Sequence, residues 1–270
     1  MSTENAAASI GVLLVGHGTR DLKGVAAFLE TAKQVQAVVP KYPLEPCFLE
    51  LAEPNIATGV ERLAQAGVEQ IVVAPVLLFS AAHAQHDIPE AVAAVASLYP
   101  RLRFQQTPPL DCHPRLVELS AQRFLQTVKP LSHIPPTSSA AWADTLLILV
   151  ARGSRDPLAL ANLQRFSAAR QKLLPVATEL CFISVTEPRF SSVLPRLPLL
   201  SYSRFVVQPH FLFPGQLVDE IRHQLPTTPP CLLTSELGPS PLLAKALAEL
   251  IEESLGTTGT NQPEDYNSVR

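Results

Sequence analysis

The sequence predicts an α/β fold built from two tandem, internally duplicated parallel-sheet domains that face a central cleft. Apolar, strand-like runs at residues 10–15, 46–51 and 70–79 alternate with helical patterns that start at about Val25 and Asn55. An alternation of strands and helices is typical of a parallel sheet, because each helix carries the chain back to the start of the next strand. The second half of the chain repeats the scheme.

The repeat is visible in the letters themselves. LLVGHGTRD in the first half matches LILVARGSRD in the second, at an offset of 153 − 18 = 135. Further matches follow at nearly the same spacing: Glu53-Pro54 with Glu187-Pro188, and Pro75 with Pro209, the latter offset by 209 − 75 = 134. Such internal similarity indicates a duplication. We expect domains at 9–128 and 145–256, a Pro/Ser-rich linker at 129–144 and a disordered tail at 257–270.

Composition restricts the class of partner. The 270 residues are 47% hydrophobic and 17% charged, with a net charge of −3, so the chain can bury a core but has no basic block for nucleic acid or an anionic membrane. We find no targeting segment and no apolar run of the length that crosses a bilayer. The four cysteines are widely spaced without a CxxC pair, which favours a reducing cytoplasm. A small-molecule partner fits best.

Chemistry is expected at the carboxyl ends of the strands, where open parallel sheets bind their ligands. The two copies differ at these ends in three places: His17 corresponds to Arg152, Glu50 to Ser184, and His83 to Leu217. Only the first half has metal-capable side chains at all three places. The sequence therefore predicts one site, in the first half.

Each of the three side chains also has an ordinary explanation. His17, between two glycines, could hydrogen-bond the backbone of a tight turn, and Glu50 could be an exposed charge at a strand end. His83 and His86, three residues apart, could lie on a helix surface beside a helix start at Asp87. Together, however, two imidazoles and a carboxylate after strands of one sheet form a plausible site for a divalent metal. Glu53 has a counterpart in the second half, which suggests a structural role, and His210 ends a strand that faces the expected cleft but has no partner pattern.

Three segments resemble one known family. LLVGHGTR, FLELAEP and PVLLFSAAHAQHDIPE are similar to the sirohydrochlorin chelatases of the class II tetrapyrrole chelatase superfamily, strongly over about residues 10–125 and more weakly to about 255. The resemblance implies a two-domain chelatase that inserts Co²⁺ or Fe²⁺ into sirohydrochlorin for cobalamin or sirohaem biosynthesis. It also implies a monomer whose halves take the place of two subunits.

The resemblance further implies site residues. It assigns metal binding and catalysis to His17, Glu50 and His83, and contact with the tetrapyrrole to Leu78, Phe79, Ser80, Ala81 and Ala82. We expect His17 to be the main proton acceptor and His83 the main metal ligand, because neutral imidazole can do either near neutral pH. Arg20, with Arg152 or Arg155, is a candidate to hold substrate carboxylates. We expect no cofactor besides the substrate metal, and no iron–sulphur cluster, since relatives that carry one have a Cys-x-x-Cys motif.

Two other functions remain open at this point. A non-catalytic carrier of tetrapyrrole or metal would use the same residues. A phosphoryl-transfer enzyme could use GHGTR as a phosphate loop, but Gly16 stands where a histidine phosphatase has an arginine, and Glu50 and His83 would be unexplained.

Overall fold

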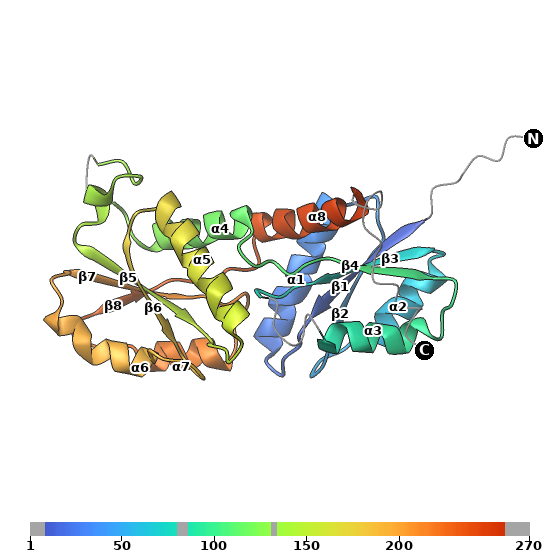
Figure 1. Ribbon diagram of the computed structural model, residues 1–270, viewed down its shortest axis with the longest axis horizontal. Coiled ribbons are helices and arrows are strands. Elements are labelled where there is room, and N and C mark those ends of the chain that lie inside the picture. Colours follow the sequence, from blue (N-terminus) through green and yellow to red (C-terminus); the bar gives the residue numbers. More distant parts are fainter. Residues whose placement is uncertain (1–8, 80–85, 131–133, 257–270) are drawn as a thin grey trace, which may run out of the picture. The chain divides into compact units, whose positions relative to one another are not determined.

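The structure is a computed structural model that describes residues 9–79, 86–130 and 134–256 (Figure 1). The chain forms two compact units. Unit 1 contains the residues up to Pro109 together with those from Ala244 onward, and unit 2 contains Leu110–Leu243. The chain therefore crosses between the units twice.

Unit 1 is built on a parallel sheet of four strands in the order β2-β1-β3-β4. Its elements in chain order are β1 Ile10–Gly16, α1 Leu22–Val38, β2 Leu44–Phe48, α2 Ile56–Gln65, β3 Gln70–Pro75, α3 Ile88–Ala96 and β4 Arg103–Gln106, with α8 Pro241–Gly256 returning from the end of the chain.

Side chains of the loops set where the helices begin. Asp21 accepts a hydrogen bond from Lys23 N at 2.9 Å, so α1 begins three residues before the expected Val25. Asn55 caps α2 through Thr58 N at 3.0 Å, which confirms the expected start. Asp87 stands at the N-cap of α3 and Pro89 lies in its first turn, as the sequence predicts.

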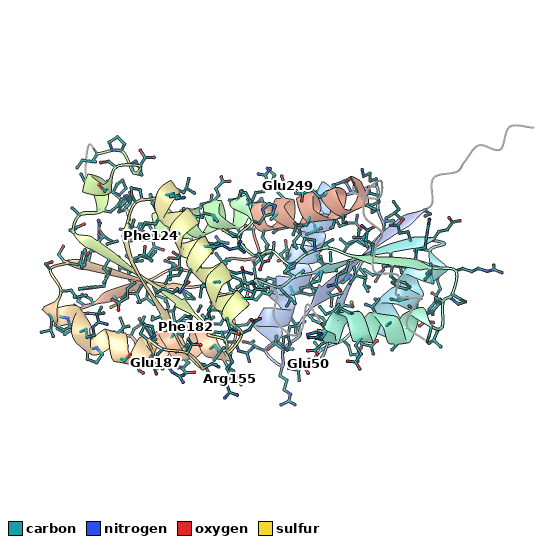
Figure 2. The ribbon with its side chains drawn as sticks, viewed as in Figure 1. Glu50, Phe124, Arg155, Phe182, Glu187 and Glu249 are labelled. Atoms are coloured by element: carbon teal, nitrogen blue, oxygen red, sulfur yellow. The ribbon has the colours of Figure 1, made fainter. Side chains whose placement is uncertain are left out.

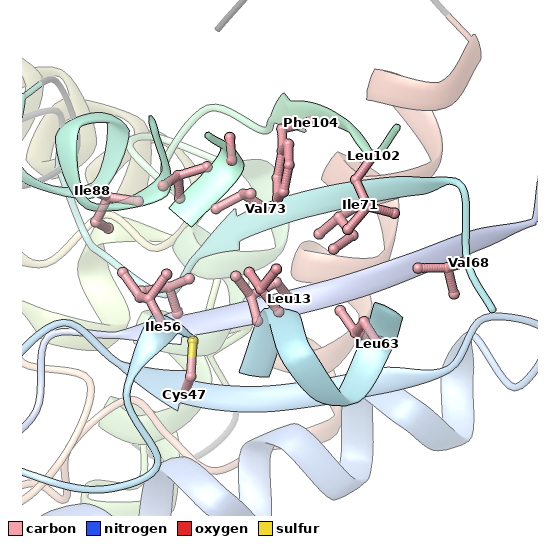
Figure 3. Close-up of a cluster of buried hydrophobic side chains, with 14 residues drawn as sticks. Leu13, Cys47, Ile56, Leu63, Val68, Ile71, Val73, Ile88, Leu102 and Phe104 are labelled. Carbon is pink, nitrogen blue, oxygen red and sulfur yellow. The ribbon is translucent and has the colours of Figure 1, made fainter. Parts of the chain in front are cut away.

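Both faces of this sheet are buried. One face packs against α2 and α3 in a cluster that includes Leu13, Cys47, Ile56, Ile71 and Ile88 (Figure 3). Val12 and Leu14 alternate with Leu13 along β1 and are just as completely buried, because successive side chains of a strand point to opposite faces. A sheet buried on both faces explains why its strands are continuous apolar runs.

Unit 2 repeats the plan with the strand order β6-β5-β7-β8, again parallel. Its elements are α4 Pro114–Thr127, a 3-10 helix at Ser139–Trp142, β5 Thr145–Ala151, α5 Pro157–Leu173, β6 Ala177–Phe182, α6 Phe190–Val193, a 3-10 helix at Leu194–Leu199, β7 Arg204–Pro209, α7 Gln216–Gln224 and β8 Cys231–Leu233. The prediction of two parallel-sheet α/β units is confirmed.

The segment expected to be an irregular linker supplies part of the core of unit 2. Trp142 is buried, donates a hydrogen bond from Nε1 to Pro136 O at 2.8 Å and meets the ring of Phe124 edge-on at 5.1 Å. Phe124 lies on α4 (Figure 2). This cluster covers one face of the sheet, and α6 and α7 cover the other.

The last helix of each sequence repeat belongs to the unit formed by the other repeat. α4 follows β4 along the chain but is part of unit 2, and α8 follows β8 but, from Ala244, is part of unit 1. α8 is tied to unit 1 by an ion pair between Lys41 and Glu252 at 3.1 Å and by a hydrogen bond from Gln105 Nε2 to Ser254 O at 2.6 Å. Among the described residues, no helix is long and apolar enough to span a membrane.

Candidate functional site

The strand order of unit 1 singles out one edge of its sheet. From β1 the chain moves to β2 on one side, and then to β3 on the other side of β1. From β3 the chain moves to β4, farther out on that same side. The loops after β1 and β3 therefore leave in opposite directions, and it is beyond the carboxyl ends of the strands at such a point that open parallel sheets bind their ligands. His17 directly follows β1, and Leu78 and Phe79 follow β3.

The structure brings two of the predicted residues together there. His17 Nδ1 lies 3.5 Å from Glu50 Oε1, and the two side chains are 30% and 52% exposed. Both can therefore reach a ligand from solvent. A carboxylate beside Nδ1 favours the neutral tautomer that carries its proton on that nitrogen, which leaves Nε2 as the basic nitrogen.

The backbone fixes this pair. Leu49 N donates to Gly16 O at 2.9 Å and Glu50 N donates to His17 O at 3.0 Å, so the chain after β2 continues the ladder with the chain after β1. Ala52 N then donates to Glu50 O at 2.8 Å across Leu51, whose φ is +62°. This closes a tight γ-turn in a conformation that is uncommon for leucine. The turn sets the point from which the Glu50 side chain starts.

The close approach of these two loops requires a glycine at position 18. Its φ is +97°, and a Cβ at this position would collide with the carbonyl oxygen of Glu50. Only glycine combines that backbone conformation with so close an approach. The glycine of the GHG motif therefore serves the contact between the two loops.

Replacing Gly18 by alanine is expected to lower the free energy of unfolding by about 3 kcal/mol, because strain at positive φ and a backbone collision add up. Gly67→Ala is the matched control, since Gly67 has a φ of +78° but no atom lies within 4 Å of the place that a Cβ would take there. The control should cost only about 1 kcal/mol. Urea unfolding of both variants measures the difference, and equal losses would contradict a role for the collision.

The remaining predicted residues are only partly placed. Leu78 and Phe79 are half-buried, whereas Ser80, Ala81, Ala82 and His83 lie outside the described residues. Their part in the site therefore stays a prediction. His86 and Arg20 are exposed to solvent.

Unit 2 has the same backbone hydrogen bonds between the two loops, but not the side chains of His17 and Glu50. Ser184 N donates to Arg152 O at 3.0 Å, Thr186 N donates to Ser184 O at 2.7 Å, and Val185 has a φ of +64°, as in the γ-turn of unit 1. Arg152 is exposed where unit 1 has His17. Within the described part of the chain, no three His, Cys, Asp or Glu side chains form a group that could hold a metal ion.

His210 does not face solvent, although it directly follows β7. It is 2% exposed, its N–H donates to Val150 O at 2.7 Å, and its ring lies 4.4 Å from that of Phe166. Burial lowers the pKa of His210 to about 3, since desolvation disfavours the charged imidazolium. His210 is therefore a neutral core residue at neutral pH.

This burial predicts a loss of stability in mild acid. The unfolded chain takes up a proton at His210 below pH 6.5, while the folded chain does so only near its much lower pKa. Stability is therefore lost as the pH falls from 6.5, by about 2 kcal/mol at pH 5 for this group. The substitution His210→Val introduces the residue that unit 1 has at the equivalent position, Val76. It should remove this part of the pH dependence of the free energy of unfolding, as measured in urea. Exposed His223→Val is the control and should leave it unchanged.

Sequence reasoning missed two features of the site. It did not identify Leu51 as the residue that directs Glu50, and it left Gly18 as a flexible flank of His17. The repeat offered a signal for Gly18, because Gly153 stands at the matching position. In the structure Gly153 also has a positive φ, and a Cβ there would collide with Ser184 O. Nothing in the letters marks Leu51, whose counterpart is Val185.

The chain is similar in sequence to one family of known proteins. The CbiX family model matches residues 11–127 and 146–254. A sirohydrochlorin ferrochelatase of Bacillus subtilis (strain 168) is 31% identical over 251 residues, which cover 90% of this chain and 91% of the relative. A sirohydrochlorin cobaltochelatase of Priestia megaterium is 29% identical over 216 residues, which cover 79% of this chain and 68% of that relative.

The fold has a solved counterpart. The structure of SirB from Bacillus subtilis with Fe³⁺ superposes with a TM-score of 0.79 at 28% identity, over 93% of this chain and 98% of that one. The matched regions contain both repeats and the loops that carry His17 and Glu50. The chain belongs to the CbiX family.

Proposed function

We propose that this protein is a sirohydrochlorin chelatase, which inserts Co²⁺ or Fe²⁺ into the macrocycle and releases two protons. The observation that carries the proposal is the His17–Glu50 pair, 3.5 Å apart beyond the carboxyl ends of β1 and β2, in a family member whose relatives are named ferrochelatase and cobaltochelatase. Imidazole and carboxylate accept either ion, so the choice of metal depends on availability and geometry more than on these ligands.

The residues suggest a division of roles. We assign proton abstraction from the pyrrole nitrogens to His17, with Nε2 as the base and Glu50 stabilising the imidazolium that forms. We assign metal binding mainly to His83, with His17 and Glu50 completing the ligands. Leu78, Phe79, Ser80, Ala81 and Ala82 are proposed to line the macrocycle, and Arg20 to bind one of its carboxylates.

The chain is proposed to work without a resident cofactor or iron–sulphur cluster, as a monomer in the cytoplasm. All four of its cysteines are free. Burial raises the pKa of the Cys47 thiol, and raises that of Cys181 to about 12, so these two act as apolar core residues and not as ligands. We further propose that 9–128 is the catalytic repeat and 145–256 a degenerate one.

The test is metal insertion followed by absorbance. Purified protein is mixed anaerobically with metal-free sirohydrochlorin and Co²⁺ or Fe²⁺, with both substrates in excess over protein. Many turnovers per protein molecule, well above the uncatalysed rate, are expected. A single stoichiometric change without turnover would identify a carrier and overturn the proposal.

A further inference from the structure

α4 and α8 occupy equivalent positions in the two sequence repeats, and each belongs to the unit that the other repeat forms: α4 to unit 2 and α8, from Ala244, to unit 1. Their first residues, Pro114 and Pro241, are separated by 241 − 114 = 127 positions. The backbone just before them repeats at that spacing too: Thr107 N donates to Val73 O, and Thr234 N donates to Val207 O. Equivalent helices of the two repeats therefore belong to the opposite units, and correct folding requires that each helix is directed to its own unit.

The face of unit 2 that α4 covers is polar at its centre. Arg170 on α5 and Gln208 on β7 are 0% and 1% exposed. Arg170 Nε donates to Ser120 Oγ of α4 at 3.2 Å, and Gln208 Nε2 donates to Ser120 O at 2.8 Å and to Ser120 Oγ at 3.2 Å. The Arg170 guanidinium carbon also lies 5.1 Å from the ring centre of Phe124, on the same helix.

Burying Arg170 and Gln208 costs free energy. Arg170 Nη1 and Nη2 and Gln208 Oε1 have no hydrogen-bond partner among the described residues. Burial lowers the pKa of Arg170 to about 10, so the guanidinium still carries its charge at neutral pH. Apolar side chains of similar size would commonly give an equally or more stable core. Stability alone does not account for the set.

Unit 1 is apolar at every equivalent position. Val35 stands where unit 2 has Arg170, at 170 − 35 = 135, and Ala74 stands where it has Gln208, at 208 − 74 = 134. On the helices, Leu247 of α8 matches Ser120 of α4, at 247 − 120 = 127. Val35, Ala74 and Leu247 are all buried. Each helix therefore matches the chemistry of the face that it covers.

We propose that Ser120, Arg170 and Gln208 make unit 2 selective for α4 and reject α8. With α8 in that place, Leu247 would replace Ser120, and the hydroxyl that accepts from Arg170 Nε and Gln208 Nε2 would be lost. The helix backbone could still accept from Gln208, but Arg170 Nε would have no acceptor. With α4 on unit 1, the hydroxyl of Ser120 would stand among Val35 and Ala74. A buried polar group without a partner costs more than the hydrogen bond is worth, so each mismatch disfavours the wrong assembly.

The test exchanges residues between the repeats. Ser120→Leu alone should lower the folded-to-unfolded ratio by about 10- to 100-fold, since it removes the hydroxyl and leaves the buried Arg170 Nε without an acceptor. Adding Arg170→Val and Gln208→Ala gives a triple variant in which both faces and both helices are apolar. The triple variant should regain the lost stability, which a mutant cycle in urea measures. Failure of the two added changes to relieve Ser120→Leu would overturn the proposal.

Two further measurements, the emission of Trp142 and the elution volume, report whether α4 has returned to unit 2. Trp142, the single tryptophan of the chain, touches Phe124 when α4 is in place, and Ile251 stands at the matching position of α8 (251 − 124 = 127). Phe124→Ile in the wild-type background calibrates the emission of Trp142 beside isoleucine. After refolding from guanidinium, wild-type protein should return to its native emission and its native elution volume.

The refolded triple variant should differ in both respects. We expect part of its Trp142 emission to shift toward that of Phe124→Ile, and the fraction of larger assemblies to rise about tenfold, because helices then also exchange between chains. A triple variant that refolds with wild-type emission and elution, or that does not fold, would overturn the proposal. The double variant Arg170→Val and Gln208→Ala should show a smaller change in the same direction.

Discussion

Alanine in place of His17 is expected to lower kcat/KM for metal insertion by about 10²- to 10⁴-fold, the range that a positioned general base contributes. The ring directly follows β1 and has Glu50 3.5 Å from its Nδ1, and alanine offers no nitrogen that could accept a proton there. The anaerobic absorbance assay measures the rate, and binding of Co²⁺ is measured separately.

The separate readouts test the proposed roles. His17→Ala should reduce turnover more than metal binding, whereas His83→Ala should reduce both. His86→Ala is the matched control, since His86 is exposed beside the start of α3, and it should stay near the wild-type rate. If His17→Ala and His83→Ala lose binding alone, the assignment of His17 as the base is wrong.

Ending the chain after Ser240, which removes α8, is expected to unfold unit 1 and abolish activity, although no proposed site residue is removed. Leu247, Leu250 and Ile251 of α8 are almost fully buried. At about 1.5–3 kcal/mol each, their burial amounts to about 5–9 kcal/mol, comparable to the whole stability of a domain. The ion pair of Glu252 with Lys41 is exposed and adds little.

Unit 2 should survive this truncation, because α4 and Trp142 belong to it. Limited proteolysis is expected to degrade unit 1 while native-like Trp142 emission remains. A chain that ends at Gly256 is the control and should keep full activity. Retention of activity in the chain that ends at Ser240 would show that unit 1 is complete without α8.

The sequence predicted the repeated sheets and the His17–Glu50 pair because both depend on local patterns. Apolar runs mark buried parallel strands, and residues after neighbouring strands meet at one edge of the sheet. The burial of His210 was not predictable in this way, since a strand end does not tell whether a helix residue such as Phe166 covers it.

The exchange of α4 and α8 also escaped sequence reasoning. Both helices are amphipathic, and an apolar stripe says that a helix is covered without saying by which sheet. The information lies in the pairs formed by Ser120 with Arg170 and Gln208, far apart in the chain. Such pairs can be recognised only once the folded chain brings them together.

The order of synthesis gives the helix exchange a further consequence. A ribosome releases the chain from its N-terminus, so α4 emerges when the sheet of unit 1 exists and that of unit 2 does not. For that interval the vacant face of unit 1 is the only one within reach, and α4 must not settle on it. The partner of that face, α8, is made after every other helix that the structure describes. The unit whose strands are translated first therefore finishes folding only after α8 has been released, later than the strands of unit 2.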